Sequence, residues 1–208
     1  GNINAEDIGF QIAPKINAAG RLAEASLAVK LFLENDEKAC RKIAKKLTKL
    51  NNIRKEECRN CLESTLSNVD IAKCKRDNCY VGVVDYSLGI LGIVASQIAE
   101  KIHVPVIIVA EAKDLKYGKV LKGSCRSVFG INIFEILEQC SSHLLQFGGH
   151  EMAAGITLLP GNINEFTKTF SQKVSENAGN IVIERSIDIE LELEKSLSTK
   201  TIKDLQLL

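Results

Sequence analysis

Three short segments combine glycine with basic or hydroxyl side chains, and they are the places where this sequence could do chemistry. They lie at residues 12–21, 122–127 and 147–155. Polar groups of this kind are costly inside a protein core unless they meet hydrogen-bonding partners. Glycine lets the backbone approach a ligand closely and adopt conformations that other residues avoid. We therefore expect these segments to bind a polar or anionic ligand.

The segment Lys122-Gly-Ser-Cys-Arg-Ser127 suits a phosphate group. It lies on or beside a predicted strand, where alternate residues point to the same face, so Ser124 and Arg126 share one face and Ser127 lies on the other. The planar guanidinium of arginine donates two parallel, charge-assisted hydrogen bonds to a phosphate. The hydroxyls and Lys122 add donors that could converge on the same anion. An arginine on an exposed edge strand is the alternative interpretation.

The other two segments offer a set of donors and a histidine. Residues 12–21 carry Lys15, Asn17 and Arg21 among small residues, although a plain helix entry after proline explains the same pattern. In the third segment, Gly148 and Gly149 are predicted to place His150 at a tight turn between a helix and a strand. An imidazole there could donate to a phosphate oxygen, ligate a metal or move a proton. A lone histidine is usually structural, but the paired glycines favour a site.

A zinc module is the alternative that the cysteines raise. Cys58, Cys61, Cys74 and Cys79 could in principle form a tetrahedral zinc site. However, the first two lie three residues apart in a predicted helix, where they share one face as small apolar residues. The other two have no C-x2-C spacing. The total of seven cysteines is odd, which argues against a disulfide framework, so we expect reduced structural thiols.

Composition narrows the class of protein. The chain has 208 residues, with 27 Lys and Arg against 26 Asp and Glu, so any basic surface must be local. No apolar run approaches the ~18 residues of a membrane span, and the N-terminus has no signal-peptide pattern, which predicts a soluble, cytoplasmic protein. The abrupt beginning at Gly1 and the end just after a helix-like stretch favour a piece cut from a longer protein.

The N-terminal elements are predicted to be helices. Residues 26–69 have apolar side chains at helical spacing, interrupted at Asp36, which is a good N-cap for a second helix of about 30 residues. Such a helix suits a connector between two lobes. Its outer face carries lysines and arginines that are more typical of a solvated face than of a DNA track, namely Arg41, Lys42, Lys45, Lys46 and Lys49.

From residue 76 the pattern becomes that of an α/β layer structure, with a βαβ unit at its start. Strands are predicted at 80–84, 104–110, 119–128 and 153–159, and helices from the turn at 87–89 to 102, at 133–146 and at 163–177. The glycines of residues 87–96 match no nucleotide-binding motif and are expected to let a helix pack closely on the sheet. We assign 1–75 to an inter-lobe motif and connector helices, 76–180 to the α/β domain, and 181–208, with a half-exposed strand at 187–193, to the start of a further domain.

Taken in this order, IAPKINAAGRL, LGILGIVASQIAEK, KGSCRS and FGGHEMAAGI resemble the C-terminal motifs of the RecJ family, bacterial single-stranded-DNA exonucleases of the DHH phosphoesterase superfamily. The resemblance covers residues 8–160 and implies a DHH-associated domain with a central sheet flanked by helices. Residues 185–208 are similar to the start of the OB-fold domain that follows in the family. The implied whole enzyme degrades DNA from its 5′ end, in repair and recombination.

The resemblance also implies Mn²⁺ or Mg²⁺, held by Asp and His ligands of an N-terminal lobe. The sequence contains no D-x-D or D-H-H cluster, so two-metal hydrolysis cannot be assembled from this chain. We therefore predict that the chain alone binds DNA and cleaves nothing. The partners implied are single-stranded DNA and a single-strand-binding protein or helicase, with the protein as a monomer and outside the membrane.

By motif match, Ser124 and Arg126 would bind a phosphate near the 5′ end, and Asn17 and Arg21 would line the cleft between the lobes. Gly149 and His150 would face the scissile phosphate, with the imidazole in a supporting catalytic role.

The sequence departs from the family pattern at one place. The family usually has Trp-His-Pro-Gly where this chain has Tyr86-Ser87-Leu88-Gly89. Tyr86 could still stack on a base, a contact worth about 1 to 3 kcal/mol in single-strand binders. Two alternatives stay open: a DHH-type phosphodiesterase acting on short oligonucleotides or cyclic dinucleotides, and a noncatalytic nucleic-acid-binding relative.

Overall fold

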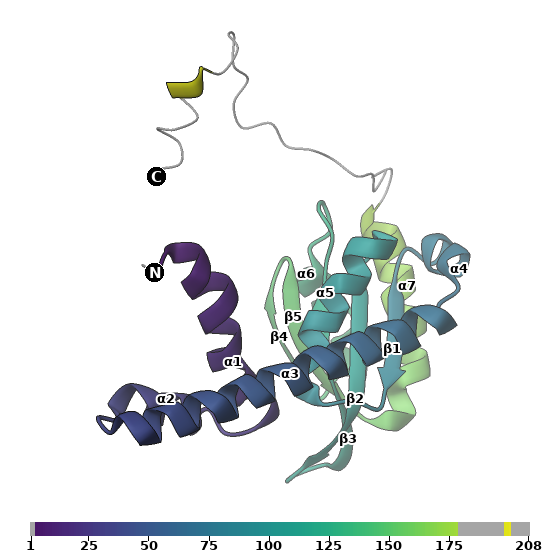
Figure 1. Cartoon of the computed structure of the whole chain (residues 1–208). Helices are drawn as coiled ribbons and strands as arrows, with labels where there is room; N and C mark the ends of the chain where they lie inside the picture. Colours follow the sequence, from purple (N-terminus) through teal and green to yellow (C-terminus); the bar gives the residue numbers. More distant parts are fainter. Residues whose placement is uncertain (1–2, 179–197, 201–208) are drawn as a thin grey trace.

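The N-terminal part of the protein is helical. The structure, a computed structural model, describes residues 3–178 and 198–200. A π-helical segment, η1 (Asp7–Ile12), runs directly into α1 (Ala13–Leu22), and α2 (Ser26–Leu33), α3 (Glu37–Asn68) and α4 (Ile71–Arg76) follow. The long helix α3 crosses the molecule and joins this helical part to the sheet (Figure 1).

The predicted start and length of α3 are confirmed. The Asp36 carboxylate accepts a hydrogen bond from the backbone N–H of Ala39 at 2.8 Å, so it satisfies one of the free donors of the first turn. The helix has 32 residues. Its inner face packs with α1 and α2 around Ala19, Ala28 and Leu47, and the basic residues fall on the opposite, exposed side.

A five-stranded mixed sheet forms the centre of the α/β part. Its order is β1-β2-β3-β5-β4, with β1 and β2 parallel and the other neighbours antiparallel. The strands are β1 (Tyr80–Val84), β2 (Val106–Asp114), β3 (Gly118–Arg126), β4 (Gln146–His150) and β5 (Ala153–Leu158). The parallel pair with the helix between them confirms the predicted βαβ unit.

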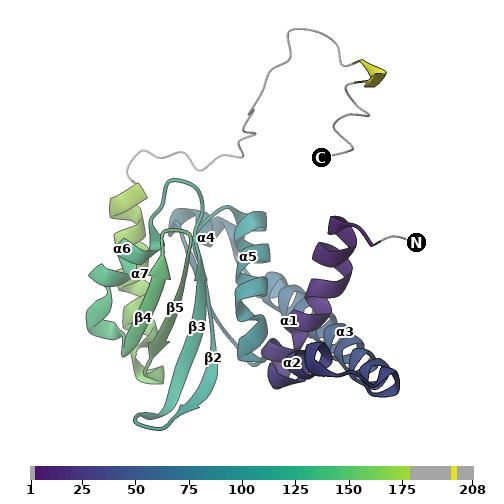
Figure 2. The same cartoon turned by 90° about the vertical axis from the view of Figure 1, so that its left-hand side faces the viewer.

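Helices cover both faces of the sheet, as Figure 2 shows. The remaining elements are η2 (Leu88–Ile90), α5 (Leu91–Ile102), α6 (Ile133–Gln139), η3 (Ser141–His143), η4 (Pro160–Asn162) and α7 (Ile163–Ala178). β2 shows how its two faces divide: Ile108 packs with Val94 and Ile98 of α5, whereas Ile107 packs with Phe166 and Ile136 of the other layer. The α/β prediction is therefore confirmed.

Two predicted elements were wrong. The helix predicted for 133–146 ends at Gln139, because the chain then forms η3 and enters a strand that the sequence did not suggest, β4. Consequently His150 is not at a tight turn between a helix and a strand. It is the last residue of β4, paired with Ala153 of β5, and the turn falls at Glu151 and Met152.

The strand predicted at 187–193, and with it the predicted OB-fold start, lies outside the described residues. Within the part that the structure describes, no helix is both long and apolar enough to span a membrane.

Candidate nucleic-acid interface

Within the described residues, no helix covers one half of a sheet face, and this half holds five of the predicted site residues. α5 packs on one face of β2 and β3. On the same face, residues of β3, β5 and β4 that lie opposite one another form three rows across the strands. We call these nine residues the open face: Lys122, Thr157 and Gln146; Ser124, Gly155 and Gly148; Arg126, Ala153 and His150. The period of two along each strand places them together, because residues two apart point to the same side. The predicted common face of Ser124 and Arg126 is confirmed.

Arg126 is held in place by hydrogen bonds to two elements. Its Nε donates to the Ser96 hydroxyl of α5 at 3.0 Å, and its Nη1 donates to Ser124 Oγ at 3.1 Å and to the Cys125 carbonyl at 2.7 Å. Ser96 in turn donates to the Gly92 carbonyl at 3.0 Å. Among the described residues, no hydrogen bond engages Nη2 of Arg126. The guanidinium is therefore oriented before any ligand arrives and keeps donors for one.

Gly92 makes room for this arrangement. A Cβ at position 92 would lie 2.7 Å from Nη2 of Arg126 and 3.0 Å from the Ser124 hydroxyl. Glycine thus lets the first turn of α5 approach the two side chains directly, and the positive end of the helix dipole favours an anion at that place. Sequence reasoning missed Gly92 and Ser96 as site residues, although it did expect the glycines of this segment to allow close packing.

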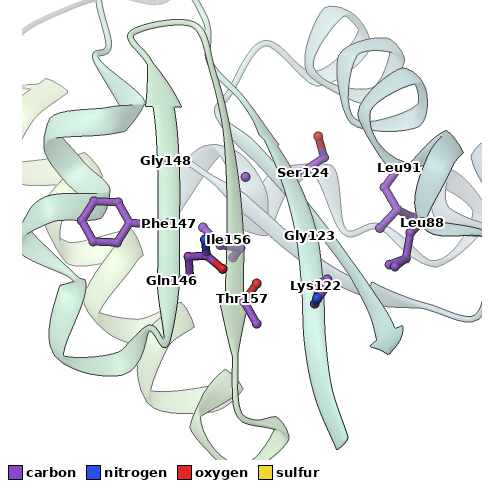
Figure 3. A pocket seen from close by; sticks show the side chains of 11 residues that line it. Leu88, Leu91, Lys122, Gly123, Ser124, Gln146, Phe147, Gly148, Ile156 and Thr157 are labelled. Carbon is purple, nitrogen blue, oxygen red and sulfur yellow. The ribbon is translucent and has the colours of Figure 1, made fainter. Parts of the chain in front are cut away.

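A hollow of about 500 Å³ lies beside these groups. Figure 3 shows it between Leu88 and Leu91 on one side and β4 on the other, with Ser124 at its rim. Leu88 is exposed and forms an apolar wall with Leu91. Pockets that bind small ligands typically enclose about 300 to 1,000 Å³, so this hollow is large enough for one nucleotide.

The glycines of β4 play two different parts. A Cβ at Gly148 would meet nothing within 4 Å, so this residue leaves the floor of the hollow bare. Gly149 has φ of +151°, and a Cβ there would collide with the Ala153 carbonyl and with Ala154. Position 149 therefore requires glycine for packing, whereas Gly148 and His150 lie on the open face.

The N-terminal motif reaches the edge of this site through one contact. Arg21 donates from Nη1 to the Gly89 carbonyl at 2.9 Å, and a Cβ at Gly89 would collide with the backbone of Arg21. α1 is thereby held against η2, beside the Leu88 wall. Asn17 lies one helical turn before Arg21, exposed and on the same side of α1. Lys15 is half-buried and lies on a different side of that helix.

Three predicted binding residues either form contacts with other residues or lie away from Arg126. The Lys122 ammonium pairs with Asp114 at 3.4 Å, so it is turned toward the β2–β3 hairpin. The Ser127 hydroxyl donates to the Ile131 carbonyl at 2.6 Å, on the other side of the sheet from Arg126. Tyr86 packs in the core under α5 and lines a separate hollow of about 360 Å³ between α3 and β1. The structure therefore does not bring these three side chains to the phosphate-facing atoms of Arg126.

Comparison with known proteins supports the resemblance. The family model described as DHHA1 domain matches residues 77–176, which contain all five strands. Residues 77–176 are a DHHA1 domain. The open face and its hollow therefore belong to the DHHA1 domain, and only Arg21 and its neighbours on α1 come from outside it.

The relatives of known activity are RecJ proteins. The chain is 38% identical over 180 residues to the single-stranded-DNA-specific exonuclease RecJ of Dickeya dadantii (strain 3937), a match that covers 83% of this chain and 31% of that protein. It is 35% identical over 158 residues to the same-named protein of Bacillus subtilis (strain 168), a match that covers 76% of this chain and 20% of that protein. The chain thus spans less than a third of the length of these curated relatives.

Solved structures agree. The crystal structure of RecJ in complex with Mg²⁺ from Thermus thermophilus superposes with a TM-score of 0.73 at 30% identity, over 83% of this chain and 26% of that one. A crystal structure of exonuclease RecJ bound to manganese gives the same TM-score and identity, over 86% of this chain and 44% of that one. The resemblance to RecJ that the motifs predicted is confirmed.

The residues that the structure describes do not fit the divalent metal of those relatives. In residues 3–178 and 198–200, no three His, Cys, Asp or Glu side chains are grouped so that they could hold a metal ion. The four cysteines of the zinc alternative are divided between two cores: Cys58, Cys61 and Cys74 lie under α5, and Cys79 lies in the layer of α6 and α7. Burial raises the pKa of each of these thiols, that of Cys79 to about 12.

Proposed function

We propose that this DHHA1 domain is the substrate-binding part of a RecJ-like exonuclease, and that its open face holds the 5′-phosphate end of single-stranded DNA. The observation that carries the proposal is the fixed guanidinium of Arg126, which shares a face with Ser124 beside a nucleotide-sized hollow. Such a guanidinium binds a phosphate without first losing the conformational freedom of a long side chain.

The chemistry of the open face fits a terminal phosphate. Nη2 of Arg126 and the Ser124 hydroxyl supply donors at the first turn of α5, and His150 stands on the same cross-strand row as Arg126, at the exposed edge of the sheet. A terminal phosphate carries more charge than an internal one, so charge-assisted bonds favour it. His150 would then donate to an oxygen of the bound strand in a supporting role.

The remaining features follow from the resemblance to RecJ and form part of the same proposal. The whole enzyme would degrade single-stranded DNA from 5′ to 3′ with Mn²⁺ or Mg²⁺, whose ligands lie outside the described residues. It would act in the cytoplasm, in DNA repair and recombination, as a monomer that meets single-strand-binding protein or a helicase. The chain of residues 1–208 would bind DNA without cleaving it.

Binding assays with this chain test the proposal. Fluorescence anisotropy with a 5′-phosphorylated oligonucleotide should give tighter binding than with the same strand ending in a 5′-hydroxyl, and Arg126→Gln should abolish the difference. Loss of one charged contact is worth about 1.5 to 3 kcal/mol, or roughly 10- to 100-fold in Kd. Lys168→Gln, on the far helix α7, is the matched control and should change nothing.

Two results would contradict the proposal. Equal affinity for the two strand ends would remove the terminal phosphate from the site. Digestion of single strands by the purified chain with Mn²⁺, at the rate of a whole RecJ enzyme, would show that binding and cleavage are not divided as proposed. Preferential binding of a cyclic dinucleotide would favour the phosphodiesterase alternative.

A further inference from the structure

Next to the phosphate-binding residues, the hollow has a floor without side chains. Gly155 of β5 pairs with Gly148 of β4 and with Ser124 of β3. A Cβ at Gly148 would meet nothing within 4 Å, and one at Gly155 would meet only the Gly123 carbonyl at 3.7 Å. Neither position therefore needs glycine for the packing of the domain itself. The missing side chains instead leave bare backbone on which a flat group can lie.

The row beyond this floor contains a hydroxyl that no other described residue engages in a hydrogen bond. Thr157 is only 9% exposed, it lines the hollow, and its hydroxyl forms no hydrogen bond within the described part of the chain. Among the described residues, the fully buried polar side-chain atoms without a partner are Arg54 Nε and Glu57 Oε2, so the Thr157 hydroxyl is open to the hollow, where a ligand can take the place of water. The hydroxyl is therefore available to donate to a ligand in the hollow and to accept from it.

Gln146 of β4 is the cross-strand partner of Thr157 of β5 and lies beside it (Figure 3). Its amide is exposed and offers both a donor and an acceptor. On the other side, Lys122 forms an ion pair with Asp114, so the Thr157 hydroxyl and the Gln146 amide are the polar groups of this row that have no partner among the described residues. Together the hydroxyl and the amide can hydrogen-bond to a donor and an acceptor that lie next to each other on a ligand. The edge of a nucleobase carries such a neighbouring donor and acceptor.

The distances along the strands suit the two halves of one nucleotide. Thr157 lies two residues from Gly155, and two strand residues span about 7 Å. A phosphate held at Ser124 and Arg126 would therefore have its own nucleoside over the glycine floor and its base near Thr157 and Gln146. The apolar wall of Leu88 and Leu91 would cover the base from the side of α5.

We propose that the hollow is a nucleoside subsite, in which Thr157 and Gln146 hydrogen-bond to the base of the nucleotide whose 5′-phosphate binds Ser124 and Arg126. This inference rests on the proposed function, because it takes the phosphate position from it. It goes further in that it assigns the hollow to a base and gives that base two hydrogen-bonding partners.

A cycle of two variants and two ligands tests the subsite. The ligands are 5′-phosphorylated oligonucleotides that differ only at the first nucleotide, which carries thymine or is an abasic tetrahydrofuran. Thr157→Val keeps the shape and the strand propensity of threonine and removes the hydroxyl, so it should fold as stably as the parent. It should weaken binding of the thymine strand roughly three- to ten-fold and leave the abasic strand unchanged. Thr157→Ser should restore the preference.

Two other results would overturn the subsite. If Thr157→Val weakens both strands equally, or neither, the hydroxyl does not contact the base and the subsite is overturned. If the parent protein binds thymine and abasic strands equally, no base lies in the hollow. The proposed function fails separately, when Arg126→Gln leaves the preference for a 5′-phosphate intact, whereas the subsite can fail while that preference still depends on Arg126.

Discussion

Replacing Gly92 with alanine should separate DNA binding from stability. The new Cβ would stand 2.7 Å from Nη2 of Arg126 and 3.0 Å from Ser124 Oγ, so one of them must move. The guanidinium is the far end of a flexible side chain and can swing outward at low cost, whereas α5 and β3 are fixed by the core between them. We expect the fold to survive and the phosphate-binding geometry to be lost.

The lost contacts set the size of both effects. Displacing Arg126 breaks its hydrogen bonds to Ser96 and Ser124, each worth only about 0.5 to 1.5 kcal/mol here because Arg126 is half-buried and water solvates the guanidinium once it swings outward. Against this, alanine favours the helix over glycine by up to about 1 kcal/mol and so raises the free energy of unfolding. The net change is on the order of 1 kcal/mol, which shifts the Tm of a domain of this size by about 2 to 4 °C. Affinity for 5′-phosphorylated DNA should fall roughly 10- to 100-fold, because the charged contact is gone.

The assay is fluorescence anisotropy on parent and variant, with thermal unfolding measured on the same samples. Gly161→Ala is the matched control, since a Cβ there meets nothing within 4 Å and the residue lies in η4, away from the open face. The reasoning would be refuted if Gly92→Ala bound the phosphorylated strand as tightly as the parent, or if both alanine variants lost affinity alike.

Three further predictions concern the fold around the site. Gly149→Ala should lower the free energy of unfolding, measured in urea titrations, by about 2 kcal/mol or more, because φ is +151° and the new Cβ has no room. Gly148→Ala should fold normally and weaken nucleotide binding. Equal stability of the two variants would contradict this prediction. In native protein, iodoacetamide should modify Cys40, the half-buried thiol, well before the six buried ones, and elemental analysis should find no zinc; rapid loss of all seven thiols would contradict the packing. The free energy of unfolding should fall as pH rises from 9 toward 12, because folding raises the pKa of Cys79 from 9.0 to about 12 and the unfolded state therefore loses the thiol proton first. The slope is about 1.4 kcal/mol per pH unit for this thiol. Cys79→Ala should make the free energy of unfolding depend less steeply on pH.

Local patterns were enough to predict much of the fold. Asp36 followed by a long apolar period predicted the cap and extent of α3, and the β-branched run before residue 110 predicted a buried strand. The common face of Ser124 and Arg126 followed from the two-residue period of a strand alone. Each of these inferences depends on residues close in sequence, where geometry is fixed by the element itself.

What could not be predicted depends on contacts between distant elements. β4 contains two adjacent glycines and no alternation of apolar residues, so its strand form comes from pairing with β5 and not from propensity. The sheet order, which the sequence does not state, brings Gln146 next to Thr157. Ser96 and Gly92 enter the site only because α5 packs on β3.

Tyr86 illustrates the same limit. Its position in the motif suggested a base-stacking residue, but the chain turns after β1 so that the ring packs toward α3 and away from the open face.

Contact between Arg126 and the terminal phosphate of single-stranded DNA is tested most directly by the NMR signal of the arginine's own Nε–H group. The signal can be assigned by its loss in Arg126→Gln and followed while a short 5′-phosphorylated strand is added. We predict a saturable shift that is far smaller with the 5′-hydroxyl strand. If the strand binds while the Arg126 signal stays in place, or shifts equally for both ends, DNA is held elsewhere on the protein.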